Sequence, residues 1–171
     1  MKRTTAAIMA SMITGASLLR ARRHASTGAV GVVGTRLQTW IPPAPRSALT
    51  RLVAAMWASP VTLAGLLAGA GSATRPRFVD GIVLFAPARG ITGLLIRRRG
   101  FTAAGLGHVV IALEEPSASL LAHELAHVRQ AERLGPFMAP AYLALLAVHG
   151  YRHHPMERAA RLAAERHATR R

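Results

Sequence analysis

Two histidines and a glutamate stand at a spacing that suits metal chemistry, in the run His123-Glu124-Leu125-Ala126-His127. On a helix, residues four apart lie on one face, so both imidazoles can bind one tetrahedral zinc ion. Glu124, next to His123, is placed to reach a zinc-bound water rather than the metal. Zinc lowers the pKa of such a water toward 7, and Glu124 can accept its proton during attack on a carbonyl. The motif therefore predicts a zinc-dependent hydrolase site with Glu124 as general base.

A catalytic zinc needs a third protein ligand, and the sequence narrows the choice. A metzincin would have glycine at position 130 and histidine at position 133, whereas this chain has Gln130 and Arg133. No aspartate follows position 80, and Glu132 lies five residues past His127 on the same predicted helix, where its side chain points elsewhere. The remaining later carboxylates are Glu157 and Glu165.

Glu157 is the better candidate of the two. It follows the turn 151–155, which can return the chain to the motif helix, and it lies in the first turn of the next predicted helix. His149, His153 and His154 are rival third ligands, because imidazole also binds zinc well. We predict Glu157 as the ligand and keep the three histidines as alternatives.

The segments His123–His127 and Glu157–Ala160 together resemble the gluzincin-type zinc metallopeptidases, in which a later glutamate, often in an E-x-x-A context, is the third ligand. More closely, residues 52–161 look like uncharacterised bacterial membrane-associated proteins with an apolar segment, a few strands, an H-E-L-x-H-V-x-Q helix and a closing P-x-E-R-x-A. The resemblance implies Zn²⁺ held by the two histidines and Glu157, and a peptide or protein substrate. Arg161 replaces an aspartate found in some gluzincins, which leaves the partner that would orient a ligating histidine unidentified.

A hydrolase also needs a donor that stabilises the developing negative charge near the metal. Tyr151, His153 and His154 are candidates because they are close to Glu157 in sequence. His108 is another, since it lies on the predicted strand before the motif helix. We select Tyr151 and His154 as the catalytic donors to test.

Composition excludes several other chemistries. The chain of 171 residues has no cysteine, which removes thiol catalysis, thiolate zinc sites and disulfides. Its formal net charge is +15, from 22 Lys+Arg against 7 Asp+Glu, and this balance suits an anionic lipid surface or nucleic acid. Aromatic residues make up only 5%, and no nucleic-acid-binding module is recognisable. We therefore do not expect a nucleic-acid partner.

Three segments follow one another along the chain. Residues 1–46 are basic and read as a poorly ordered extension, although their start resembles a signal peptide. Within 47–75, residues 52–73 carry no charge and are long enough to cross a membrane. Pro60 would either kink one span there or divide the stretch into two short helices. Residues 76–171 are the predicted zincin-like metal-binding domain.

The metal-binding domain begins with strands and continues with helices. Runs rich in β-branched residues predict strands at 78–85, 91–96 and 108–113. Helical periodicity then begins after Pro116 and stops at Gly135, and helices are expected at 140–149 and from Pro155 onward. We predict an α+β fold with an apolar N-terminal helical segment, a small antiparallel sheet, the HExxH helix and two further helices.

The function expected from this pattern is a membrane-associated zinc metallopeptidase at a bacterial cytoplasmic membrane. Two alternatives stay open. One is a catalytically silent zincin-like protein with a structural or partner-binding role, although Glu124 would have no use in it. The other is an arginine-rich binder of anionic surfaces. The sequence leaves the substrate, the membrane topology and the oligomeric state open.

Overall fold

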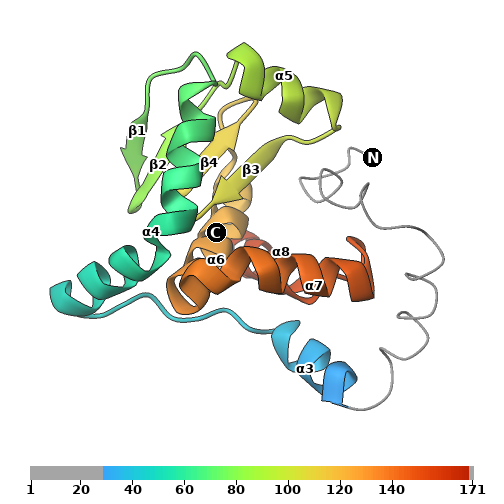
Figure 1. Ribbon diagram of the computed structural model, residues 1–171. Coiled ribbons are helices and arrows are strands. Elements are labelled where there is room, and N and C mark those ends of the chain that lie inside the picture. The colour runs from blue at the N-terminus through green and yellow to red at the C-terminus, as the bar shows by residue number, and fades with distance from the viewer. Residues whose placement is uncertain (1–28, 170–171) are drawn as a thin grey trace.

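A computed structural model of the chain describes residues 29–169. The predicted extension over 1–46 therefore lies largely outside the described residues. Its described part contains helix α3 (Ala29–Leu37), which packs against the last helix of the chain, and an irregular segment that leads to residue 47. Figure 1 shows this segment passing beneath the helices of the C-terminal part.

The sheet has four short strands, β1 (Arg77–Val79), β2 (Ile82–Phe85), β3 (Ala103–Leu106) and β4 (Val109–Ala112). Their order is β1-β2-β4-β3, so β3 forms one edge. The outer pairs are antiparallel, but β2 and β4 run parallel. The α+β class is confirmed, whereas the purely antiparallel sheet was wrong. A helical connection leads from β2 to β3, and the reversal between β3 and β4 then makes β4 run in the same direction as β2.

That connection is helix α5 (Gly90–Arg98), where a strand over 91–96 was expected. The expectation failed because an apolar run as short as residues 91–96 does not distinguish a strand from a helix. Gly93 and Ile96 are buried against the sheet, while Ile91, Leu94 and Leu95 are exposed on the opposite side.

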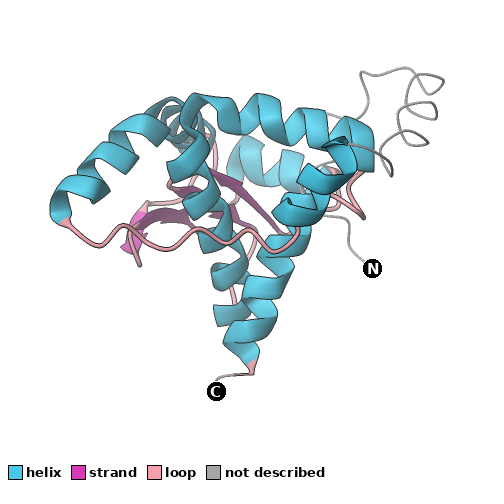
Figure 2. Cartoon of the chain, turned by 90° about the horizontal axis from the view of Figure 1, so that it is seen from below, coloured by secondary structure: helices cyan, strands magenta, loops and turns pink. Residues whose placement is uncertain are grey.

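The two faces of the sheet pack against different helices. One face, with Ile82, Leu84 and Val110, packs against Val128 of helix α6 (Ala118–Leu134). The other face is covered by α5 and by helix α4 (Ala48–Ala70). Helices thus enclose a small central sheet, as the view from below also indicates (Figure 2). The metal motif lies in α6, across the sheet from α5 and from the C-terminal half of α4, and α4 also contacts α6 directly.

Helix α4 is continuous through Pro60 rather than divided at it. It begins at Ser47, whose side chain and that of Thr50 form a capping box. Proline cannot donate a hydrogen bond to the carbonyl of Met56, and the hydroxyl of Ser59 donates to that carbonyl instead (2.7 Å). The C-terminal half packs on the sheet, and the N-terminal half projects from the body (Figure 1).

After α6 the chain turns sharply at Gly135, whose φ of 53° suits glycine. A short 3₁₀ turn, η1 (Gly135–Phe137), leads into α7 (Met138–His149), and a second turn leads into α8 (Pro155–Ala168). These are the two further helices that the sequence predicts. Ala159 and Ala160 of α8 are fully buried, so this helix can approach α6 closely.

Candidate metal centre

Helix α6 brings His123 and His127 together as their spacing predicts. The helix begins at Ser117, whose side chain accepts a hydrogen bond from the backbone of Leu120, so the motif lies well inside regular helix. The two Nε2 atoms are 3.3 Å apart, and both side chains are largely buried. The imidazoles thus point at one common position.

Glu157 completes this cluster from the first turn of α8. Its Oε1 lies 3.3 Å from His127 Nε2, and its Oε2 lies 3.6 Å from His123 Nε2. Two atoms that are each about 2.0–2.1 Å from one tetrahedral zinc lie about 3.3–3.4 Å apart. The three side chains therefore fit a single ion of this kind, and within the described residues they form the group of His and acidic residues suited to hold a metal.

The charges in the cluster are strongly coupled. Burial alone would raise the pKa of Glu157, but the attraction and hydrogen bonds of His127 and His123 outweigh it and hold the pKa far below its usual range. Burial alone would lower the pKa of His127, yet Glu157 and Glu124 raise it to about 9. The carboxylate and the imidazole thus favour each other's charged forms. A divalent cation at this position would supply positive charge to the carboxylate instead.

Glu124 lies beside the cluster and is only 5% exposed. Burial raises its pKa, and the neighbouring histidines oppose this effect only in part. Its carboxylate lies against the edge strand β3, where a Cβ added to Gly105 would be 2.5 Å from Glu124 Oε2. The absence of a side chain at Gly105 therefore gives the carboxylate its space. A desolvated carboxylate with a raised pKa is suited to accept a proton.

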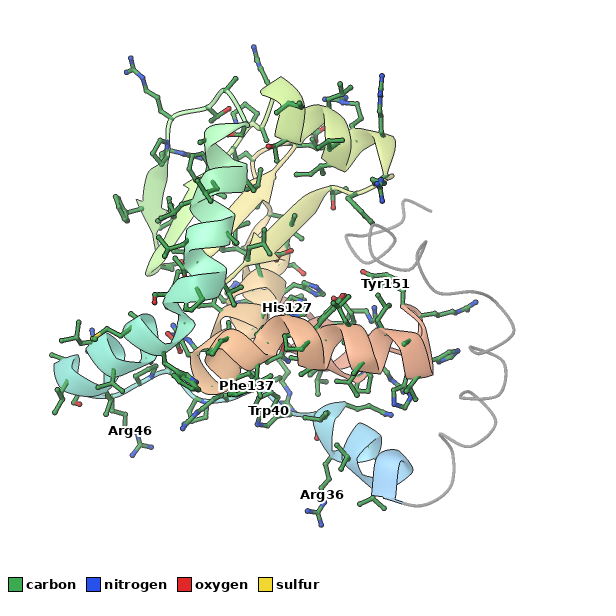
Figure 3. All side chains as sticks on the ribbon, viewed as in Figure 1. Arg36, Trp40, Arg46, His127, Phe137 and Tyr151 are labelled. Carbon is green, nitrogen blue, oxygen red and sulfur yellow. The ribbon has the colours of Figure 1, made fainter. Side chains whose placement is uncertain are left out.

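Two tyrosine hydroxyls donate hydrogen bonds to Glu157. Tyr151, in the turn before α8, donates to Oε2 (3.0 Å), and Tyr142 of α7 donates to Oε1 (2.7 Å). Figure 3 labels Tyr151, from the turn before α8, and His127, from α6. The predicted Tyr151 is therefore at the site, while Tyr142 was missed. Its only sequence signal is a hydroxyl in the otherwise apolar helix of residues 138–149.

His154 is at the site, where both of its ring nitrogens contact backbone atoms. It is fully buried, and it caps α8 by accepting a hydrogen bond from the backbone N–H of Glu157 (3.4 Å). Its other ring nitrogen, Nε2, donates to the carbonyl of Tyr142 (3.0 Å). Because both nitrogens are engaged with backbone, the structure favours a role for His154 in positioning Glu157 over the predicted role of catalytic donor.

The rival residues lie elsewhere. The ring of His149 faces α3, with atoms 3.1 Å from where a Cβ on Gly34 would be. His108 contacts Glu132 (3.2 Å) and the hydroxyl of Thr62 on α4 (3.2 Å). The contact with His108 explains why the side chain of Glu132 points away from the metal cluster. The other rivals, His153 and Glu165, are exposed and outside the cluster.

Gln130 supplies the orienting partner that the sequence did not identify. It is fully buried, and its Oε1 accepts a hydrogen bond from His127 Nδ1 (2.9 Å). Its Nε2 donates to the backbone carbonyl of Trp40 (3.3 Å), which lies below α6 in Figure 3. With Nδ1 held as a donor, Nε2 of His127 is the nitrogen free to bind metal. The i, i+3 spacing from His127 is the signal that could have revealed this role.

Replacing Gln130 with leucine should weaken zinc binding by about 10- to 100-fold, because His127 loses the contact that fixes its ring orientation. Gln130→Glu retains an acceptor for His127 Nδ1 and should keep most of the affinity. Competition with a chromophoric zinc chelator measures both variants against the unchanged protein. Equal affinity of Gln130→Leu would mean that His127 is oriented by its surroundings alone.

No protein-family model matches this chain, and neither does any curated protein or solved structure. The resemblance to gluzincins therefore rests on the residues described above.

Proposed function

We propose that this chain is a membrane-associated zinc-dependent hydrolase, and specifically a metallopeptidase of the gluzincin kind. The observation that carries the proposal is the convergence of His123, His127 and Glu157 within 4.8 Å, with the buried carboxylate of Glu124 beside them. A purely structural zinc site is usually closed by four protein ligands. Three ligands with an adjacent carboxylate favour a catalytic site instead.

Zinc is the metal best suited to these donors. Two imidazoles and one carboxylate form a nitrogen- and oxygen-based set that zinc accepts in tetrahedral geometry. When bound, zinc would act as a Lewis acid toward a substrate carbonyl and would lower the pKa of a water molecule. Two of the three ligands are held by other side chains, His127 by Gln130 and Glu157 by the two tyrosines.

The protein residues then have separate tasks. Glu124 accepts a proton from the attacking water and can pass it to the leaving amine. Tyr151 is the candidate donor for charge that develops on the carbonyl oxygen, and its hydroxyl would turn to that oxygen from Glu157 Oε2, to which it donates in the structure. Burial of Glu124 and Glu157 keeps bulk water from weakening these interactions.

The proposed place of action is the bacterial cytoplasmic membrane. Within residues 29–169, α4 is the helix that is long and apolar enough to cross a bilayer, with a mean hydropathy of 1.6. Only 17% of its most apolar window is buried inside the molecule. An exposed apolar helix in a strongly basic chain favours a lipid partner. The substrate proposed is a peptide or protein segment.

The full chain, purified in mild detergent, should contain about one zinc ion per molecule by elemental analysis. Incubation with a mixture of unstructured peptides, followed by mass spectrometry, should reveal cleavage that a chelator stops and zinc restores. A folded protein that takes up zinc and cleaves nothing would support the silent, structural alternative. A folded protein that takes up no zinc would contradict the metal site itself.

A further inference from the structure

The outer side of α4 is an apolar stripe that runs along the whole helix. The residues that contact the sheet and α6, among them Ala58, Gly65 and Gly69, recur on one side of the helix. The opposite side carries large apolar residues, with exposed fractions that reach 70% at Leu49 and 78% at Leu67. The stripe consists of Leu49, Leu52, Val53, Met56, Leu63 and Leu67. Soluble monomers rarely expose a large contiguous apolar surface, so this stripe indicates a binding partner.

Helix α5 extends the same surface. The hydroxyl of Thr92 donates to the carbonyl of Ala68 (2.6 Å), which joins the start of α5 to the end of α4. Both helices pack on one face of the sheet, so their exposed sides point away from it. On α5 these exposed residues are Ile91, Leu94 and Leu95. We call the apolar stripe of α4 together with these three residues the outer face.

Arginines surround the outer face. Arg46 and Arg51 lie at the start of α4, Arg75 follows its end, and the three arginines 97–99 end α5. All of them are exposed. Between residues 46 and 99 the sequence contains eight arginines and a single acidic residue, Asp80. Guanidinium groups beside an apolar surface complement the phosphates and acyl chains of an anionic bilayer. A second copy of this chain would bring like charges together instead.

We propose that the outer face lies flat on an anionic phospholipid bilayer and enters one leaflet without crossing it. This inference rests on the membrane association proposed above, but not on the zinc chemistry. A spanning α4 would have to leave the sheet, because Gly65 lies against Leu106 and Gly69 against the ring of Phe85. It would also lose the contact between Thr62 and His108. Attachment through the outer face keeps all these contacts.

This attachment also orients the metal centre. The cluster lies in α6 and α8, and α6 packs on the face of the sheet opposite to α5 and the C-terminal half of α4. The centre is thereby directed away from the lipid, toward the aqueous phase. The substrate segment would accordingly be a soluble or membrane-proximal peptide rather than one within the bilayer.

Vesicle flotation tests the outer face directly, and it requires neither zinc nor turnover. The full chain should float with vesicles of phosphatidylcholine and phosphatidylglycerol, and much less with phosphatidylcholine alone or at about 0.5 M salt. Leu63→Gln/Leu67→Gln should bind at least about tenfold more weakly. Val32→Gln/Val33→Gln, which removes two exposed apolar residues from α3, is the matched control and should bind normally. Equal binding by the first variant would overturn the proposal.

Two further measurements distinguish an anionic bilayer from other binding partners of the outer face. A wild-type dimer that Leu63→Gln/Leu67→Gln makes monomeric, with unchanged flotation, would overturn the proposal in favour of a second copy. If that variant does not fold, Arg97→Gln/Arg98→Gln replaces it and should lose the preference for anionic vesicles; a retained preference would count against the proposal.

Membrane topology can be determined with cysteines that are introduced one at a time, because the chain has no cysteine of its own. Ala44 and Pro76 are exposed and lie on either side of α4. Cysteines introduced singly by Ala44→Cys or Pro76→Cys should both react with an impermeant maleimide added outside the vesicles. Protection of one of them would indicate a span and overturn the proposal. Because zinc content is measured on the same samples, failure at the membrane is distinguishable from failure of the hydrolase proposal.

Discussion

Zinc binding should be lost when Glu157 is replaced by glutamine. The amide keeps the size of the side chain and can still accept hydrogen bonds from Tyr142 and Tyr151, so the fold should persist. It removes the negative charge that faces both histidines at 3.3 and 3.6 Å. The loss of an orienting partner typically lowers metal affinity by about 10- to 100-fold. Because Glu157→Gln removes a direct ligand, its zinc affinity should fall by more than that.

Elemental analysis and chelator competition measure this effect, and circular dichroism checks the fold. Glu165→Gln is the matched control, since it makes the same chemical change at an exposed position of the same helix. It should bind zinc as the unchanged protein does. Zinc retained at full affinity by Glu157→Gln would remove Glu157 from the site and return the choice to the histidines near it.

Replacing Glu124 with glutamine should have the opposite profile, with zinc retained and turnover lost. Glutamine fits the space beside Gly105 but cannot accept a proton. Since general acid–base catalysis contributes about 100- to 10,000-fold, kcat should fall by at least about 100-fold. The experiment compares kcat on a cleaved peptide with the zinc content of the same preparation.

Glu114→Gln serves as the control for this change, because Glu114 is exposed and lies outside the site. It should leave both kcat and zinc content unchanged. Activity that survives Glu124→Gln would exclude Glu124 as the general base. Loss of zinc together with activity would instead assign Glu124 a role in holding the metal.

A partly buried network joins α4 to α6, the helix that carries the HExxH motif. Glu132, whose position in the sequence already argued against a ligand role, contacts His108 and Arg129. His108 in turn contacts Thr62 of α4. This network connects α4 to the helix of the metal motif and lies apart from the metal cluster, which explains why neither His108 nor Glu132 belongs to the site.

Local features of the chain were predictable because they depend on neighbours in sequence. The i, i+4 spacing of His123 and His127 sets their positions on one face of any helix. Gly135 ends that helix at a φ that suits glycine. The apolar stretch 52–73 was likewise visible without a structure. What could not be read from periodicity alone was α5, where the short apolar run 91–96 fits either a strand or a helix.

The sequence by itself determined the helix that carries His123 and His127, the place of Glu124 beside them and the set of later residues that could complete the cluster. Only the tertiary structure selected Glu157, brought in Tyr142 from α7, and joined Gln130 to Trp40, which is 90 residues away in the chain. It also decided that one side of α4 packs on the sheet while the other stays exposed. The physical reason is that such contacts depend on how α6, α7 and α8 pack together, and no local pattern encodes that packing.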